Sequence, residues 1–344
     1  MFRPMISVVV AVFNSEKTIE KNLQAIFHQD YFSSQGKLDL IVVDDGSTDA
    51  TPEILSTFKA IKCFRQINSG PAAARNRGAQ LAQGDFIFFT DSDCVPAPDW
   101  ISKAMTHFSD PSVGVVAGSY GIMNDQNLLA RIIYQEIIFR HHALMPAYPK
   151  VFGSYNFGIR RKVFFEVGGF NTRYRYPSGE DNDLSYKIIS AGYKIYFARD
   201  SLVKHYHPSR ISKYLREQYR HGFWRVKMYR DHPGMAGGDD YTFWKDIVEI
   251  PIVLIFLISL IPLVSQQFLF FGVGFIIIFF LWIIELFYGL VMTRDQLVSS
   301  VFPPKTFLAW LKEGFFLSGI MWLRAFARTL GFSSGFFHFL VKNE

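Results

Sequence analysis

The stretch Asp85-Phe86-Ile87-Phe88-Phe89-Thr90-Asp91-Ser92-Asp93 carries the most information about the fold of this chain. Its apolar part predicts a buried strand, which two carboxylates one residue apart bring to an end. Such neighbouring carboxylates repel each other unless a cation lies between them. Mg²⁺ and Mn²⁺ prefer oxygen ligands and often bind a few carboxylates together with substrate phosphates. Because an isolated Asp-x-Asp triplet is also common in solvated turns, its meaning depends on the rest of the sequence.

The residues before this stretch alternate between short apolar runs and segments with helical periodicity. Strands are predicted over 6–12, 38–43 and 61–67, and helices over 16–29, after Ser47 and over 71–82. This alternation is typical of a parallel sheet with crossover helices, in which ligands bind at the carboxyl ends of the strands. Asn14, Asp44-Asp45 and Asp91-Ser92-Asp93 all fall at such ends. We therefore expect these side chains to meet at one edge of the sheet.

The alternation becomes less regular after residue 110. Further strands are predicted over 113–118, 152–159 and 193–198, and helices over 127–142 and 182–191. The predicted fold class of this part of the chain is α/β.

The 344 residues carry a formal net charge of +6, and much of the basic excess lies in 204–230. A basic stretch that precedes apolar segments suits an anionic membrane face or an anionic substrate. No nucleic-acid recognition motif accompanies it, so we expect no nucleic-acid partner. The two cysteines, Cys63 and Cys94, form no CxxC pair and indicate a reducing compartment without a disulfide framework or zinc site. The N-terminus leads directly into a strand without a signal-peptide pattern, so we expect the N-terminal domain in the cytoplasm.

Two nearly continuous apolar runs follow, 247–264 and 268–284. Each approaches the roughly 20 apolar residues of a membrane-spanning helix, and Ser265-Gln266-Gln267 separates them, which predicts a two-helix hairpin. The alternative is a buried helical pair in a soluble protein. A third segment, 306–340, mixes aromatic residues with charges, and whether it spans a membrane or lies in its interface stays open. Four parts are therefore expected: a domain over 1–235, a linker over 236–246, a transmembrane hairpin over 247–292 and a membrane-associated amphipathic region over 293–344.

Five motifs, spread over roughly residues 5–210, resemble those of the family 2 glycosyltransferases of the GT-A fold. They are Val8–Glu16, Val42–Asp49, Gly70–Gly78, Asp91–Asp93 and Gly179–Leu184. Ala11 departs from the family pattern, which usually has proline there. A processive polysaccharide synthase would be expected to carry Gln-x-x-Arg-Trp, whereas Gln218 is followed here by Tyr219-Arg220-His221-Gly222. The resemblance implies a Rossmann-like GT-A domain that binds a nucleotide sugar, followed in this chain by the helical membrane hairpin and a C-terminal interfacial or transmembrane helix.

By this resemblance one group of residues holds the nucleotide sugar: Ala11, Phe13, Asn14, Glu16, Asp44, Asp45, Arg75, Asp91 and Ser92. Asp44 would lie near the base, and carboxylates at a strand end can accept hydrogen bonds from a base N–H or from ribose hydroxyls. The alternative for Asp44-Asp45-Gly46 is a simple turn with a helix cap. Arg75 would approach the diphosphate, and its alternative is a solvated helix face.

The resemblance also implies a metal site at Asp93 and Asp91, completed by a histidine, with His207 preferred over His205. Mg²⁺ or Mn²⁺ at this site would neutralise the leaving nucleoside diphosphate. The alternative for either histidine is a polar loop residue.

Asp181 is the implied general base, which removes the proton from the attacking hydroxyl, and Glu180 orients the acceptor. Asp183, two residues further on, could instead cap the helix predicted over 182–191.

The expected protein is an inverting, metal-dependent hexosyltransferase of the inner membrane, multi-pass, with its catalytic domain in the cytoplasm. It would move one sugar from a nucleoside-diphosphate sugar, with a UDP-sugar as first choice, to a lipid-linked or cell-surface glycan acceptor. The alternatives are a membrane scaffold with an inactive GT-A domain, a polysaccharide synthase and a nucleotidyltransferase. A nucleotidyltransferase would need a glycine-rich loop near the N-terminus, and residues 11–20 contain no glycine.

Overall fold

The computed structural model describes residues 4–33, 37–235, 237–240, 242, 244–260, 268–302 and 306–341. The chain divides into two compact units, each made of separate stretches of sequence. The first unit comprises Met1–Asn124 and Met145–His207, and the second comprises Asp125–Leu144 and Pro208–Glu344. These units differ from the predicted domain over 1–235, because residues 125–144 and 208–235 of that range group with the C-terminal part of the chain.

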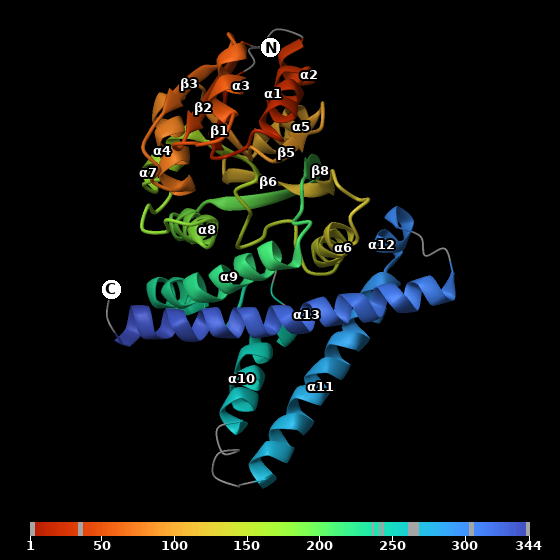
Figure 1. The fold of residues 1–344 in the computed structure, drawn as a ribbon. Coiled ribbons are helices and arrows are strands. Elements are labelled where there is room, and N and C mark those ends of the chain that lie inside the picture. The colour runs from red at the N-terminus through yellow and green to blue at the C-terminus, as the bar shows by residue number, and fades with distance from the viewer. Residues whose placement is uncertain are drawn as a thin grey trace. The chain divides into compact units, whose positions relative to one another are not determined.

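The first unit is built on an eight-stranded sheet in the order β3-β2-β1-β4-β7-β6-β8-β5 (Figure 1). In chain order the strands are β1 (Ile6–Val12), β2 (Leu38–Asp44), β3 (Lys62–Arg65), β4 (Phe86–Asp91), β5 (Cys94–Pro96), β6 (Val113–Ile122), β7 (Asn156–Arg160) and β8 (Lys194–His205). Strands β1 to β4 pair in parallel, whereas β7 is antiparallel to both of its neighbours. The predicted α/β class is therefore confirmed.

Helices connect and cover these strands. They are α1 (Ile19–Phe27), α2 (Asp30–Ser33), α3 (Thr51–Thr57), α4 (Pro71–Leu81), α5 (Trp100–Thr106), η1 (His107–Ser109), α7 (Arg161–Glu166) and α8 (Glu180–Ser190). Successive strand residues point to opposite faces of a sheet. Val8 and Phe88 accordingly pack with Trp100 in one core, while Val9 packs with Phe157 in the other. The sheet is thus buried on both sides, which leaves the strand ends as the place for polar chemistry.

Two strands differ from the sequence prediction in a way that affects the site. The three-residue strand β5 was not predicted, and β8 continues to His205 instead of ending at residue 198. The two pair antiparallel, with Cys94 opposite His205 and Pro96 opposite Val203. His205 is therefore the last residue of a strand and not part of a loop.

The second unit is helical. It contains α6 (Leu128–Ala143), α9 (Ile211–Asp231), η2 (Pro233–Met235), α10 (Trp244–Ser259), α11 (Phe268–Thr293), α12 (Gln296–Val301), α13 (Phe307–Phe336) and η4 (Phe337–Val341). Helices α10 and α11 correspond to the two predicted apolar helices, and the predicted break at Ser265–Gln267 lies outside the described residues. Among the described helices, one segment, Gly272–Thr293, is long and apolar enough to cross a membrane.

Helices α9 and α13 run side by side (Figure 1), and glycines set how closely they approach. A Cβ atom at Gly222 would collide with the carbonyl oxygen of Arg328, and one at Gly331 would collide with that of Tyr219. Small residues at a helix crossing let the two backbones come into contact. The packing of α9 on α13 therefore depends on the absence of side chains at these positions.

Paired charges occupy the interior between α6, α10, α11 and α13. Lys245 Nζ lies 2.8 Å from Glu249 Oε1 and 3.1 Å from Glu285 Oε1. Arg324 Nη1 lies 2.6 Å from Glu136 Oε1. Buried charges are tolerated when they are paired and hydrogen-bonded, so the acids Glu249 of α10 and Glu285 of α11 have a structural explanation.

We expect Gly331→Ala to lower the stability of the second unit by about 1–3 kcal/mol, the usual cost of overpacking, because the added methyl group meets the backbone of α9. Gly319→Ala is the matched control in the same helix, since a Cβ there meets no atom within 4 Å. In an open helix position this exchange stabilises by up to about 1 kcal/mol. Thermal unfolding of the detergent-solubilised variants measures both effects, and equal midpoints for the two would contradict the packing argument.

Candidate functional site

The carboxyl ends of β2, β1 and β4 form one edge of the sheet. In the strand register Val12 lies opposite Asp44, and Ala11 lies opposite Asp91. The acidic groups that end β2 and β4 therefore flank the end of β1 on both sides. The polar groups thus lie together at the carboxyl ends of the parallel strands, as the strand order leads us to expect.

The loop after β1 is tied to the loop after β2. Asn14 adopts a left-handed backbone conformation with φ 49°, and its Oδ1 accepts a hydrogen bond from the Thr48 N–H at 2.8 Å. Glu16 Oε2 accepts from the Ala50 N–H at 3.2 Å. Phe13, between them and the strand, is about half exposed. The predicted pocket residues of this loop thus lie together, and two of them hold it in shape.

Asp44 and Asp45 are both buried, and each bonds to the surrounding backbone. Asp44 Oδ1 accepts from the Ser47 N–H at 2.9 Å, while its Oδ2 lies 3.3 Å from Nε of Arg65. Asp45 Oδ2 accepts from the Gly70 N–H at 2.8 Å, directly before α4. The turn-forming alternative is therefore present in the structure, and a contact with the nucleoside stays a prediction.

Arg75 lies on α4 and is 4% exposed, so the solvated-face alternative is wrong. Its Nη2 donates to Asp91 Oδ1 at 2.7 Å, and its Nη1 donates to Glu180 Oε1 at 3.0 Å. The guanidinium also lies over the ring of Phe170. Burial opposes the charged form, but the two carboxylates prevail and raise the pKa of Arg75 above its ordinary value. One cation thus joins the end of β4 to the start of α8.

Helix α8 begins at Glu180, two residues before the predicted start, after Gly179 with φ 89°. Asp183 is consequently inside the helix and does not cap it. Glu180 is buried, and its Oε2 accepts from the Ser178 N–H at 2.8 Å. Asp181 Oδ1 accepts from the Asn182 N–H at 2.9 Å. Glu180 is therefore fixed in the first turn of the helix, next to Asp181, which is partly buried.

Burial, followed by the adjacent Glu180, raises the pKa of Asp181 to about 7, although the charge of Arg75 opposes the shift. An ordinary aspartate is a weak base at neutral pH, whereas a carboxylate with a pKa near the working pH can accept a proton efficiently. The environment of Asp181 therefore suits the general-base role that the family resemblance implies.

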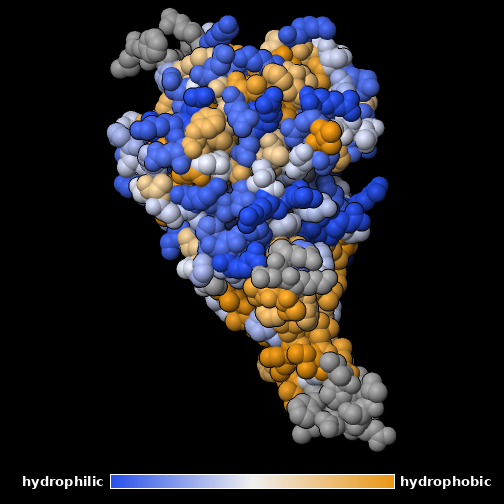
Figure 2. Space-filling model, turned by 90° about the vertical axis from the view of Figure 1, so that its left-hand side faces the viewer, coloured by the Kyte–Doolittle hydropathy of each residue, from blue (hydrophilic) through white to orange (hydrophobic). Residues whose placement is uncertain are grey.

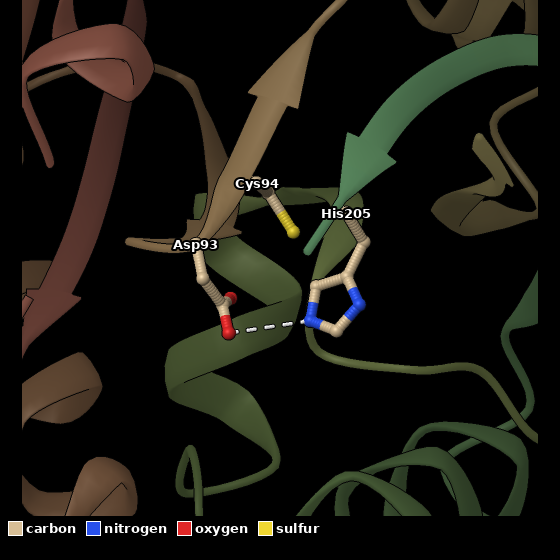
Figure 3. Close-up of side chains that lie close together, drawn as sticks. All are labelled: Asp93, Cys94 and His205. Atoms are coloured by element: carbon tan, nitrogen blue, oxygen red, sulfur yellow. Dashed lines mark ion pairs between the residues drawn. The ribbon is translucent and has the colours of Figure 1, made fainter. Parts of the chain in front are cut away.

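Asp93 lies beside a histidine and a cysteine (Figure 3). Its Oδ2 is 3.3 Å from Nε2 of His205, and the ligand atoms of Asp93, Cys94 and His205 all lie within 4.8 Å of one another. A carboxylate oxygen and an imidazole nitrogen are suitable donors for Mn²⁺ and for other divalent first-row metals. The donor set therefore fits the implied cation.

The other two predicted metal ligands lie outside this group. The carboxylate of Asp91 bonds to Arg75, and His207 is buried with its Nδ1 3.2 Å from Nδ1 of His205. Burial and the nearby His205 lower the pKa of His207 to about 3, so its imidazole is neutral. Ser92, between the two aspartates, has its Oγ 2.7 Å from Oγ of Ser15. The sequence analysis ranked His205 second and expected no zinc site at the cysteines, because Cys63 and Cys94 form no CxxC pair. Cys94 nevertheless lies in this group, and its position next to Asp93 in the sequence was the signal for it.

The chain is similar in sequence to known glycosyltransferases. The family model "Glycosyl transferase family 2" matches residues 7–169. The glycosyltransferase AglE of Haloferax volcanii is 29% identical over 66% of this chain and 74% of its own length. The pre-mycofactocin glycosyltransferase of Mycobacterium tuberculosis is 31% identical over 57% of this chain, but the match spans 43% of that relative.

A solved structure shows the same fold. The mannosyltransferase PcManGT of Pyrobaculum calidifontis, in complex with GDP-Man and Mn²⁺, superposes with a TM-score of 0.56 at 20% identity, over 96% of this chain and 88% of that one. The matches confirm the predicted fold and enzyme class. The chain is a glycosyltransferase with the GT-A fold, and its residues 7–169 match glycosyltransferase family 2.

Proposed function

We propose that this protein is a membrane-anchored, metal-dependent and inverting glycosyltransferase. It moves one sugar from a nucleoside-diphosphate sugar to a lipid-linked or cell-surface glycan acceptor. The observation that carries the proposal is the bridge from Asp91 through Arg75 to Glu180. This bridge holds the motif expected to bind the donor next to the helix that presents Asp181, as a transfer reaction requires.

The donor site consists of the residues around the ends of β1, β2 and β4. Asp44 and Asp45, with the loop residues Asn14 and Glu16, are the proposed contacts to the nucleoside. GDP-Man in the PcManGT complex supports a nucleoside-diphosphate sugar as donor. A UDP-sugar remains our first choice of donor, and a GDP-sugar is the alternative that this similarity supports.

Asp181 carries the chemical step in this proposal. Its carboxylate accepts the proton of the acceptor hydroxyl while the new bond to the sugar forms on the face opposite the leaving group. Glu180, held by Arg75 and by the Ser178 N–H, fixes the first turn of α8 and thereby the position of Asp181. Asp93 and His205, with Asp91 nearby, would hold a divalent cation, which when bound neutralises charge on the leaving diphosphate.

The apolar helices support membrane anchoring. Ile276, Phe279 and Phe280 of α11 are 57%, 56% and 60% exposed in the isolated chain. Figure 2 shows hydrophobic side chains gathered over one part of the surface. Large exposed apolar patches mark interaction sites, and for a helix of this length a bilayer is the natural partner. Anchoring places the enzyme where a lipid-linked acceptor is concentrated.

Part of the basic stretch 204–230 is available for an anionic acceptor. Lys213 and Arg216 of α9 are exposed, whereas Lys227 is buried and pairs with Asp231. A polyprenyl phosphate would fit the exposed cations by its charge. Gln218, the one residue shared with the processive motif, is buried and accepts from Nε of Arg328 at 2.8 Å. This structural role gives no support to a processive synthase.

The first test is release of nucleoside diphosphate by the detergent-purified protein with Mn²⁺ or Mg²⁺. We expect release with one donor from a panel of UDP-, GDP- and dTDP-sugars, and we expect it to require polyprenyl phosphate because the acceptor is lipid-linked. Release that is indifferent to lipid would move the acceptor to a soluble or polysaccharide hydroxyl. If the folded protein released no nucleoside diphosphate with any of these donors, the proposal would be contradicted.

We expect Asp181→Asn to lower kcat by about 10²–10⁴-fold, the range for loss of a general base. Donor binding should remain nearly unchanged, because the substitution keeps the shape of the side chain. Asp200→Asn, at an exposed position on β8, is the control and should retain activity. Steady-state kinetics and equilibrium donor binding measure the two effects, and normal turnover by Asp181→Asn would exclude this residue as the base.

The activity should also depend on pH. The base must be deprotonated to act, and the pKa of Asp181 is raised to about 7, so kcat/KM should fall about tenfold per pH unit below that value. Because Glu180 contributes to the upward shift, Glu180→Gln should move the midpoint to lower pH. A pH profile from 5 to 9 tests both statements. A flat profile between pH 5 and 8 would show that Asp181 does not limit the reaction.

A further inference from the structure

A thiol lies at the proposed metal site. Cys94 follows Asp93 directly and starts β5, which pairs antiparallel with β8 so that Cys94 lies opposite His205. Residues directly opposite each other in an antiparallel pair place their side chains on the same face, with Cβ atoms about 4.5–5.5 Å apart. The strand pairing therefore brings the thiol and the imidazole together, independently of the Asp-x-Asp motif.

The three side chains point toward one another (Figure 3), and their ligand atoms lie within 4.8 Å. Metal bonds to sulfur and nitrogen measure about 2.3 and 2.0 Å, so two ligands of one ion lie at most roughly 4.3 Å apart. Small side-chain adjustments are sufficient to bring the three donors around one ion.

The three side chains of this group differ in their exposure to solvent. The side chain of Asp93 is 38% exposed and that of His205 is 17% exposed, whereas Cys94 is fully buried. The carboxylate therefore lies on the open side and the thiol on the inner wall.

The donor chemistry determines which cations the site prefers. Thiolate and imidazole select for transition metals, while Mg²⁺ prefers oxygen ligands alone. We propose that Cys94 is a ligand of the cation held by Asp93 and His205, and that it makes the site prefer Co²⁺ and Zn²⁺ to Mg²⁺. On binding, the S–H bond breaks, the proton passes to solvent, and a sulfur lone pair coordinates the metal. This inference rests on the metal site of the proposed function.

The test is the absorption spectrum of the full-length protein, purified in detergent and titrated with Co²⁺. Coordination by Cys94 predicts a thiolate-to-cobalt charge-transfer band in the near ultraviolet from the wild type. Cys94→Ser should remove that band and retain the weaker visible bands of bound cobalt. Cys63→Ser is the matched control, since Cys63 is the other cysteine of the chain and is exposed, and it should keep the full spectrum.

Calorimetric titration gives an independent measurement. Cys94→Ser and Cys94→Ala should each weaken Zn²⁺ binding by at least about tenfold, the order found when a contact that supports a metal is lost. Mg²⁺ binding should change by less than about twofold, because Mg²⁺ makes little use of sulfur.

The possible outcomes distinguish the role of Cys94 as a ligand from the existence of the metal site. Visible cobalt bands without charge transfer in the wild type would show that Cys94 is only a core residue, while the metal site itself stands. Absence of any Co²⁺, Mn²⁺ or Zn²⁺ binding would overturn the metal site and the role of Cys94 together. The cobalt spectrum of the wild type is measured on the unmodified protein. A variant that fails to fold therefore does not affect this result.

Discussion

The catalytic unit depends on one buried guanidinium between two carboxylates. Arg75 connects three elements, since it is carried by α4 and donates to Asp91 of β4 and to Glu180 of α8. Removal of one partner from a buried pair costs about 3–5 kcal/mol, because the remaining charge is left uncompensated. Here the loss would also leave two carboxylates facing each other and would remove the charge that opposes the upward shift in the pKa of Asp181. The position of α4 is itself set at its start, where Asp45 accepts from the Gly70 N–H. A continuous set of bonds therefore runs from the end of β2 to the proposed general base.

The helical unit also depends on paired buried charges. Apolar helices that carry Glu249 and Glu285 can pack only if these acids find cations, and Lys245 lies within 2.8 Å of the first and 3.1 Å of the second. Its ammonium group also lies 4.5 Å from the ring centroid of Tyr288. Such a cluster restricts how α10 and α11 can pair, because another register would leave charges unpaired in an apolar interior. The glycines at the α9–α13 crossing restrict how these two helices can pack, because a side chain at those positions would collide with the facing backbone.

The predictable parts of this structure are those that local sequence determines. The strands β1, β2 and β4 follow from unbroken apolar runs, and α4 follows from Gly70-Pro71 and its small residues. The unpredicted parts depend on distant partners. Strand β8 passes through the polar residues Arg199-Asp200-Ser201 because it pairs with β6, with a register shift at Gly118–Ser119, and three-residue β5 exists only because β8 reaches it. Arg75 looked like a surface residue or a phosphate ligand because its partner Glu180 is 105 positions away.

The two histidines near the end of β8 show why residue type alone could not assign the proposed metal site. His205 is the last residue of the strand and faces Asp93, whereas His207 is buried and lies with Nδ1 3.2 Å from Nδ1 of His205. One of these two nitrogens must donate and the other accept. If His207 donates, a neutral His205 carries its proton on Nε2 and cannot use that atom as a metal ligand. If His205 donates from Nδ1, its Nε2 lone pair is directed toward the position beside Asp93. His207, neutral because burial holds its pKa near 3, can accept that bond. A cation at Asp93 would favour the second arrangement, in which His205 offers its Nε2 to the metal, while the role of His207 as a further ligand stays a prediction.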